Sequence, residues 1–219
     1  MPGLLRARAF DVIAAGLLLA ASVPLIVLAA LAIRIDSPGP VLFRQTRVGR
    51  GGRLFEMLKL RTMAAGADGA MHQAHVRQLI PARAPAEPWR RIDPDPRVTR
   101  VGRILRRTGI DELPQLVNVL RGEMRLVGPR PALPYEVELW QAWHFERLAV
   151  PPGITGLWQV AGRDRTSFDD MVRLDLAYIA GRSLGADLAI LARTPAVLLR
   201  RARAATLAPR APVTGPDGA

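Results

Sequence analysis

A long apolar segment near the N-terminus limits what this chain can fold into. Residues 12–35 contain one charged side chain, Arg34, and as a continuous helix they would measure roughly 36 Å, enough to cross a hydrocarbon layer of about 30 Å. Pro24 lies near the middle, where it removes one helical hydrogen bond and clashes with the preceding turn. Ser22 could satisfy a freed carbonyl, and a serine close to a proline is a known cause of kinks. We therefore expect a helix that breaks at Ser22 and Pro24.

Three structures fit this segment. The simplest is a transmembrane helix with a tolerated kink. A secretory signal peptide is the second, because Arg6 and Arg8 precede the apolar run, but the run is longer than the usual signal core of about 7–15 residues. The third is a re-entrant hairpin that enters and leaves the membrane on one side. Basic residues flank the segment on both sides, and basic flanks prefer the cytoplasm, so the charges favour the hairpin.

Charge and composition narrow the class of partner. With 219 residues the chain can form one domain with a real core, and its net charge of +12 indicates an anionic partner: nucleic acid, a phospholipid surface or a phosphate-bearing substrate. The absence of cysteine excludes disulfides and thiolate catalysis. A nucleic-acid-binding protein with an apolar anchor would also fit the charge, but no helix-turn-helix, RNP or zinc-finger pattern accompanies it. We therefore expect no nucleic-acid partner.

Periodicity and turn residues predict a mostly helical α+β protein. Strands are expected at 41–43, 54–60, 125–127 and 157–160, with a basic hairpin tip at 47–53. Helices are expected after residue 64, at 114–120, at 132–149 with four aromatic side chains, at 168–180 with Ser167 as the cap, and at 186–203. The expected units are a re-entrant membrane segment over 1–36, a small catalytic domain with interfacial amphipathic helices over 37–204, and a disordered tail over 205–219.

Two adjacent carboxylates, Asp111 and Glu112, are the clearest candidates for chemistry. Pro114 is tolerated only in the first turn of a helix, so the pair lies at a helix start, where acidic residues also stabilise by about 0.3–1 kcal/mol without any catalytic role. Arginines precede the pair, and Arg130 follows between two prolines. Paired carboxylates beside fixed arginines suit metal-assisted chemistry on a phosphate, with one carboxylate as nucleophile or base and another holding a divalent cation.

Two further groups of side chains have weaker signals. His72 and His75 lie three residues apart on a predicted helix and could share a metal, but no third ligand lies nearby, which favours surface histidines. Trp140 and Trp143 suit either core packing or contact with a membrane interface.

Blocks of sequence in a fixed order resemble one family, the monotopic polyprenyl-phosphate phosphoglycosyl transferases, or bacterial sugar transferases. The resemblance runs from about Arg8 to Leu199. It rests on RAFDVIAAGLLLAASVPL, IRIDSPGPVLFRQTRVGRGG, FEMLKLRTM, DPRVTRVGRILRRTGIDELPQLVNVLRGEMRLVGPRP, PGITGLWQVAGR and SFDDMVRLDLAYI. No single block is specific, whereas the series is.

The resemblance implies a ping-pong reaction at the cytoplasmic face of the bacterial inner membrane. The aspartate matching Asp111 attacks the β-phosphate of a UDP-sugar, UMP leaves, and polyprenyl (usually undecaprenyl) phosphate then takes the sugar phosphate from the aspartate. The glutamate matching Glu112 works with Mg²⁺, so that both carboxylates are expected at the metal. The positions expected to bind the substrate phosphates are Lys59, Arg106, Arg130, Arg163 and Asp175.

The same resemblance implies a role in starting exopolysaccharide, O-antigen or other glycoconjugate assembly, with a hexose such as galactose or glucose as the sugar. Membrane phospholipid is an expected partner, and a homodimer is one of the oligomeric states left open. Val23 separates Ser22 from Pro24, Arg182 replaces a tryptophan, and Pro195 interrupts the last predicted helix, all departures from the family pattern. We expect the minimal catalytic form, without an added N-terminal membrane bundle. An inactive membrane scaffold is the alternative, and the intact Asp111–Glu112 pair argues against it.

Overall fold

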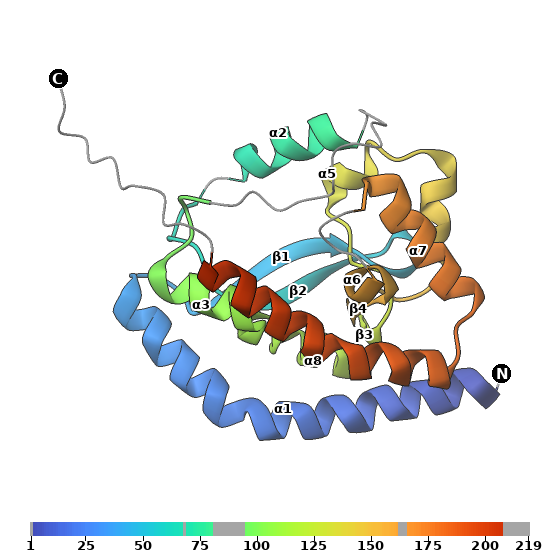
Figure 1. The fold of residues 1–219 in the computed structure, drawn as a ribbon, viewed down its shortest axis with the longest axis horizontal. Coiled ribbons are helices and arrows are strands. Elements are labelled where there is room, and N and C mark those ends of the chain that lie inside the picture. The colour runs from blue at the N-terminus through green and yellow to red at the C-terminus, as the bar shows by residue number, and fades with distance from the viewer. Residues whose placement is uncertain (1, 68, 81–94, 162–165, 208–219) are drawn as a thin grey trace.

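The computed structural model describes residues 2–67, 69–80, 95–161 and 166–207 and is a mostly helical α+β fold (Figure 1). The helices are α1 (Pro2–Asp36), α2 (Ala70–Leu79), α3 (Arg100–Thr108), α4 (Gln115–Arg121), α5 (Pro134–Val137), α6 (Leu157–Ala161), α7 (Phe168–Ala180) and α8 (Leu184–Leu207). Short 3-10 helices are η1 (Arg50–Gly52), η2 (Ile110–Glu112) and η3 (Ala142–Ala149), and the strands are β1 (Leu42–Val48), β2 (Leu54–Leu60), β3 (Arg125–Val127) and β4 (Gly153–Thr155). A central β-hairpin lies between α2 on one side and α1, α3 and α8 on the other.

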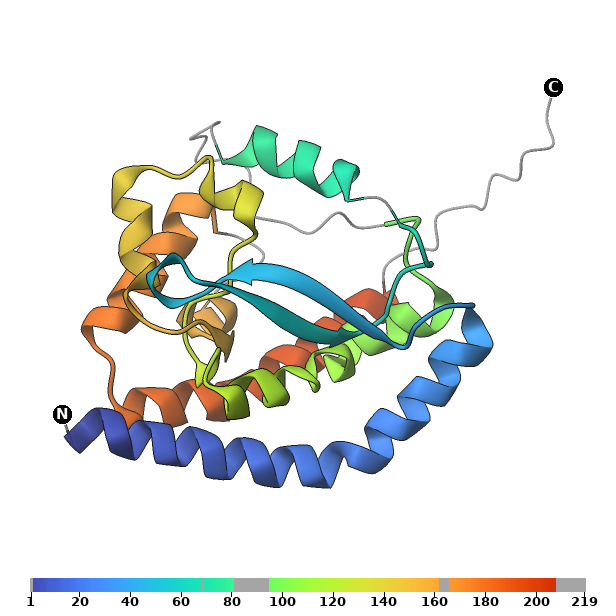
Figure 2. The same cartoon turned by 180° about the vertical axis from the view of Figure 1, so that it is seen from behind.

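Helix α1 is continuous but bends near its middle, as Figures 1 and 2 show. Pro24 lies inside it, and the Ser22 hydroxyl donates to the carbonyl of Leu19 at 3.0 Å. The expected break is therefore a bend within one helix. Residues Ala7–Asp36 are long and apolar enough to cross a membrane, and no other helix among the described residues meets that criterion.

Both halves of α1 pack on the same folded domain. In the first half, Ala15 lies in a core with Val119 of α4 and Met57 of β2. In the second half, Ala29 and Ile33 lie in a smaller core. The helix thus lies along the domain over most of its length and does not project from it.

Buried polar contacts fasten the first half of α1. The Arg8 guanidinium donates to the carbonyls of Val119 and Leu120 at 2.7 and 3.0 Å, where α4 ends. A second cluster joins α1, β3 and α8. In it, Arg125 of β3 donates to Asp11 of α1 at 2.7 Å and to Asp187 of α8 at 2.9 Å. All three charged groups of this cluster are buried, so α1, β3 and α8 are held in one arrangement.

Each of the two small sheets has two strands. In the hairpin, β1 and β2 are antiparallel with Leu42 opposite Leu60 and Val48 opposite Leu54. The prediction for β2 is confirmed, but the prediction of a strand at 41–43 followed by a loop at 47 is wrong, because pairing continues to Val48. Strands β3 and β4 are parallel.

The predicted strand at 157–160 is wrong, because these residues form α6 and the strand is Gly153–Thr155. A side chain at position 153 would collide with the backbone of Gly128, so glycine at 153 permits the close approach of β4 to the end of β3. The buried indole of Trp158 then packs from α6 into a core with Phe168 and Val172 of α7.

The aromatic segment 132–149 is not one helix, because α5 ends at Val137 and η3 begins at Ala142. Trp140 lies between them and is buried, which confirms core packing for this side chain. The predicted helix 168–180 is confirmed, with the Ser167 hydroxyl accepting from the amide of Asp170. Helix α8 passes Pro195 and continues to Leu207, beyond the predicted start of the tail at 205; positions 208–219 lie outside the described residues.

Candidate active site

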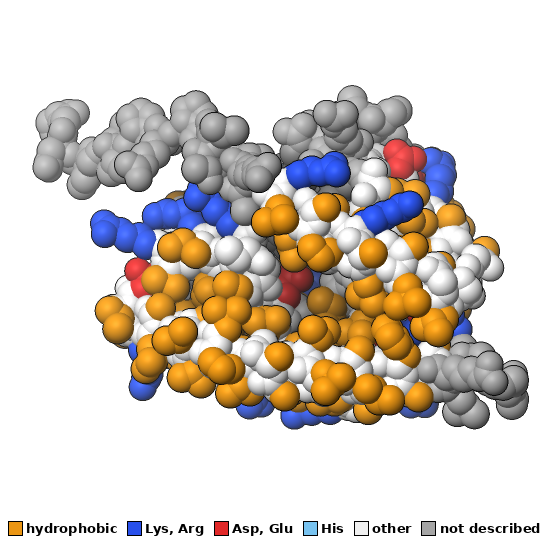
Figure 3. Space-filling view, turned by 60° about the horizontal axis from the view of Figure 1, so that its bottom comes forward, with side chains coloured by type: hydrophobic (Ala, Val, Ile, Leu, Met, Phe, Trp, Pro, Cys, Tyr) orange, Lys and Arg blue, Asp and Glu red, His pale blue; other side chains and the backbone are white. Residues whose placement is uncertain are grey.

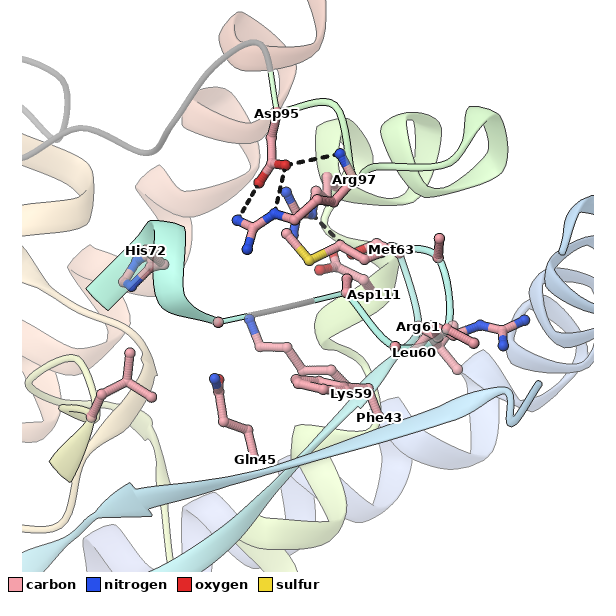
Figure 4. A pocket seen from close by; sticks show the side chains of 18 of the residues that line it. Phe43, Gln45, Lys59, Leu60, Arg61, Met63, His72, Asp95, Arg97 and Asp111 are labelled. Carbon is pink, nitrogen blue, oxygen red and sulfur yellow. Dashed lines mark hydrogen bonds and ion pairs between the residues drawn. The ribbon is translucent and has the colours of Figure 1, made fainter. Parts of the chain in front are cut away.

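A cavity of about 380 Å³ lies above the hairpin, between it, α2 and the loop that follows β2 (Figure 4). Its floor carries Phe43, Gln45, Arg47 and Lys59 from the two strands. Among the described residues, its lining is dominated by cations, Arg47, Lys59, Arg61, Arg97, Arg106 and Arg130, against two carboxylates, Asp95 and Asp111. Since Asp95 pairs with Arg97 at 2.8 Å, the remaining lining is strongly positive and suits a polyanion.

Asp111 reaches this cavity from η2, the turn between α3 and α4, and Glu112 follows it on the same turn. Gly109 ends α3 with a φ of 76°, a left-handed conformation that glycine adopts without strain. Asp111 lines the cavity and is only 5% exposed. Glu112 points to Lys59, whose Nζ lies 3.4 Å from its Oε1. The sequence prediction that the pair precedes α4 is confirmed.

A buried amide fixes the turn against the floor of the cavity. Asn118 of α4 accepts from the amide of Leu58 at 3.0 Å and donates to the carbonyl of Glu56 at 2.7 Å, both in β2. Because α4 and β2 are tied at this point, the carboxylates of η2 and the ammonium of Lys59 are held in a fixed relation.

Two of the expected cations line the cavity beside Lys59. The Nε of Arg106 donates to the Thr62 hydroxyl at 2.9 Å, which orients the guanidinium from α3 toward the loop after β2. Arg130 follows β3 and lies 3.8 Å from the buried carboxylate of Glu136. Arg163, a further expected phosphate ligand, lies outside the described residues.

Arg47 is a cavity cation that the sequence did not indicate, because it was expected in an exposed hairpin tip. It is buried, and burial together with the nearby Arg130 lowers its pKa to about 9. Its guanidinium donates to the carbonyl of Pro131 at 2.9 Å and so holds the loop that carries Arg130. No local sequence signal marks its burial, which follows from strand pairing that continues to Val48.

Asp175 lies behind the cavity and does not line it. It is 1% exposed and accepts a hydrogen bond from Arg147, which also donates to the carbonyl of Arg130 at 3.2 Å. Burial raises the pKa of Asp175 to about 6, although Arg147 acts in the opposite direction. The structure thus places Asp175 where it can support the Arg130 loop through Arg147.

His72 and Tyr135 form part of the cavity wall opposite the hairpin. The Nδ1 atom of His72 lies 2.7 Å from the Tyr135 hydroxyl. Burial lowers the pKa of His72 to about 4, so the imidazole is neutral at physiological pH. His72 is therefore half-buried and bonded, not a surface histidine, and among the described residues no group of three His, Cys, Asp or Glu side chains could hold a metal.

An apolar surface lies along α1, as Figure 3 shows. Among the most exposed large side chains are Ile13, Leu17, Leu28, Leu31 and Ile35 of α1, Ile104 of α3, and Leu188 and Leu199 of α8. Patches of this kind on a helix of membrane-spanning hydropathy indicate contact with lipid.

The long apolar helix and the cationic cavity around a buried carboxylate define a class, a membrane-associated enzyme with an anionic substrate. A family model described as bacterial sugar transferase matches residues 4–201. UDP-glucose:undecaprenyl-phosphate glucose-1-phosphate transferase of Caulobacter vibrioides is 48% identical over 203 residues, covering 89% of this chain and 70% of the relative. Exopolysaccharide production protein ExoY of Rhizobium meliloti is 40% identical over 198 residues, covering 89% and 86%. The undecaprenyl-phosphate galactose phosphotransferase of Salmonella typhimurium is 40% identical over 194 residues, 89% of this chain but 40% of that longer relative.

This chain belongs to the bacterial sugar transferase family, and the resemblance inferred from its sequence blocks is confirmed.

Proposed function

We propose that this protein transfers a sugar 1-phosphate from a UDP-sugar to polyprenyl phosphate, usually undecaprenyl phosphate, through a covalent intermediate on Asp111. One observation carries the proposal: a single buried carboxylate at the dyad faces a cavity lined by guanidinium groups and one ammonium group. Such an arrangement gives a phosphate both a nucleophile and the positive charge that neutralises its oxygens.

In the first step, a carboxylate oxygen of Asp111 attacks the β-phosphorus of the donor. The bond between the β-phosphorus and the bridging oxygen breaks, its electron pair leaves with UMP, and a sugar-phosphoryl aspartate remains. Lys59, Arg106 and Arg130 neutralise the charge on the transferring and leaving phosphates, since cations held in position stabilise phosphoryl transfer. Arg163 is expected to add a further cation.

In the second step, a phosphate oxygen of the polyprenyl acceptor attacks the same phosphorus. The bond to Asp111 breaks, the carboxylate is restored, and polyprenyl diphosphate sugar is released. Asp175 supports both steps from behind, because Arg147 connects it to the backbone of Arg130.

Mg²⁺ is the metal that this chemistry calls for. Magnesium is usually bound by one or two carboxylates together with substrate phosphates and water, and the adjacent Asp111 and Glu112 fit that requirement without a third protein ligand. When bound, the ion would neutralise charge on the diphosphate. Glu112 would hold the ion while Asp111 reacts, and its ion pair with Lys59 would then open.

The packing of α1 supports a re-entrant seat in the membrane. Both halves of the helix lie against the same domain, and Arg8 and Asp11 bond to groups inside it. If α1 crossed the membrane as a straight helix, these polar groups would have to enter the lipid with it. We place the domain at the cytoplasmic face of the inner membrane, in contact with phospholipid. The names of relatives support a hexose donor, glucose or galactose, and a role in starting exopolysaccharide assembly.

Incubation with β-³²P-labelled UDP-sugars tests the proposal. Wild-type protein should release UMP and retain label on Asp111 in the absence of acceptor, and a screen across donors should identify the sugar. Asp111→Asn should lower UMP release by at least about a thousandfold, because the nucleophile is lost. Asp170→Asn, an exposed carboxylate on α7, is the matched control and should behave as wild type. Label retained on the Asp111→Asn protein would disprove the assignment.

A further inference from the structure

Apolar side chains line part of the cavity beside its charged groups. Pro40, Phe43, Leu60 and Met63 line it there. Phe43 remains 45% exposed, which is unusual for a large aromatic side chain that lines a cavity. An exposed ring at the edge of a cationic site indicates a ligand that is apolar as well as anionic.

The hairpin register places this ring next to the reactive groups. Phe43 of β1 lies directly opposite Lys59 of β2, and opposed residues of an antiparallel pair project from the same face with Cβ atoms about 4.5–5.5 Å apart. Figure 4 shows the two side chains together on the floor. Phe43 is thus the cross-strand neighbour of the lysine that pairs with Glu112 of the dyad.

The same side of the cavity continues into the membrane helix. Leu60 packs in a buried cluster with Ala29 and Ile33 of α1. Its neighbour Arg61 donates to the carbonyls of Ser37 and Pro38 at 2.7 and 2.5 Å, which fixes the end of α1 beside β2. Ile35, in the last turn of α1, is 87% exposed. Exposed apolar side chains therefore recur from the end of α1 to the cavity, at Ile35, Pro38, Pro40 and Phe43.

We propose that the polyprenyl acceptor enters across this edge, with its hydrocarbon chain over Pro40 and Phe43 and its phosphate at Lys59. This assignment rests on the proposed function. Its reason is chemical: a UDP-sugar is polar at both ends, whereas polyprenyl phosphate joins a phosphate to a long hydrocarbon that must stay out of water. The acceptor is thus the substrate that matches an apolar edge continuous with a lipid-contacting helix.

Separate measurement of the two half-reactions tests the assignment with Phe43→Ser. The first half-reaction, UMP release and labelling of the protein without acceptor, should stay within about twofold of wild type. The KM for undecaprenyl phosphate should rise by about tenfold, as expected for loss of one apolar contact of this size. Phe43→Leu should recover most of the loss. Leu54→Ser is the matched control, because Leu54 is 63% exposed on the same hairpin but does not line this cavity.

The other possible results distinguish failure of the acceptor assignment from failure of the proposed function. A loss confined to UMP release would place the uridine on Phe43 and overturn the acceptor assignment, and equal losses in Phe43→Ser and Leu54→Ser would assign the effect to general membrane contact. A photoreactive benzophenone residue at position 43 should cross-link to polyprenyl phosphate, whereas one at position 54 should not. If the wild type itself releases no UMP from any UDP-sugar, the proposed function fails, and cross-linking still decides the lipid site.

Discussion

Arg125 holds α1 to the rest of the fold, and its removal should be unusually destabilising. Its guanidinium lies between Asp11 of α1 and Asp187 of α8, and the Tyr178 hydroxyl donates to the same Asp187 at 2.5 Å. Arg125→Met would leave two buried carboxylates without their cation. Breaking a buried pair in this way costs about 3–5 kcal/mol, a large fraction of the stability of an ordinary domain.

Urea unfolding in detergent micelles, followed by tryptophan fluorescence, measures this loss. Arg44→Met is the control, because Arg44 pairs with Glu56 at 3.4 Å on the exposed side of the hairpin and should cost less than about 1 kcal/mol. Combining Arg125→Met with Asp11→Asn and Asp187→Asn should restore part of the stability, since no uncompensated charge then remains buried. Equal effects of Arg125→Met and Arg44→Met would refute the reasoning.

Two other predictions concern groups around the cavity. Since burial lowers the pKa of His72 from 6.5 to about 4, its contribution to stability is complete above pH 6.5 and is lost as the pH falls toward 4. Between pH 7 and 5 the free energy of unfolding should fall in wild type by up to about 2 kcal/mol more than it falls in His72→Gln. Unfolding free energies with the same pH dependence in both proteins would contradict this. Asp175→Asn should lower the rate of UMP release by up to about a hundredfold, because Arg147 would no longer fix the Arg130 loop. The control Asp170→Asn should leave that rate unchanged. Equal steady-state rates of UMP release in the two variants would exclude a supporting role for Asp175.

Features set by local chemistry were predictable from the sequence. Ser167 marks the start of α7 because its hydroxyl caps the helix, and Pro114 marks the start of α4 and so locates the dyad. The β2 strand follows from its bounded apolar run. The cations Lys59, Arg106 and Arg130 were expected from the family resemblance, and the structure lines one cavity with all three.

Features set by distant partners were not predictable. The strand at Gly153–Thr155 exists because β3 lies beside it, and no periodicity in three residues reveals that pairing. Arg47 looked like part of a solvated turn, yet its burial depends on the carbonyl of Pro131, a contact across 84 positions of sequence. Asp175 was expected from the resemblance among the phosphate-binding positions, and only its packing against Arg147 shows that it lies outside the cavity lining.

The close approach of Gly128 and Gly153 has a consequence for how the cavity assembles. The amide of Gly153 donates to the carbonyl of Pro129 at 2.8 Å, so the residue beside Arg130 is secured by a segment with no atom in the cavity. A methyl group at position 153 would push the two backbones apart and carry the guanidinium with them. The position of the Arg130 guanidinium at the cavity therefore depends on a hydrogen atom at residue 153, where every other amino acid carries a carbon.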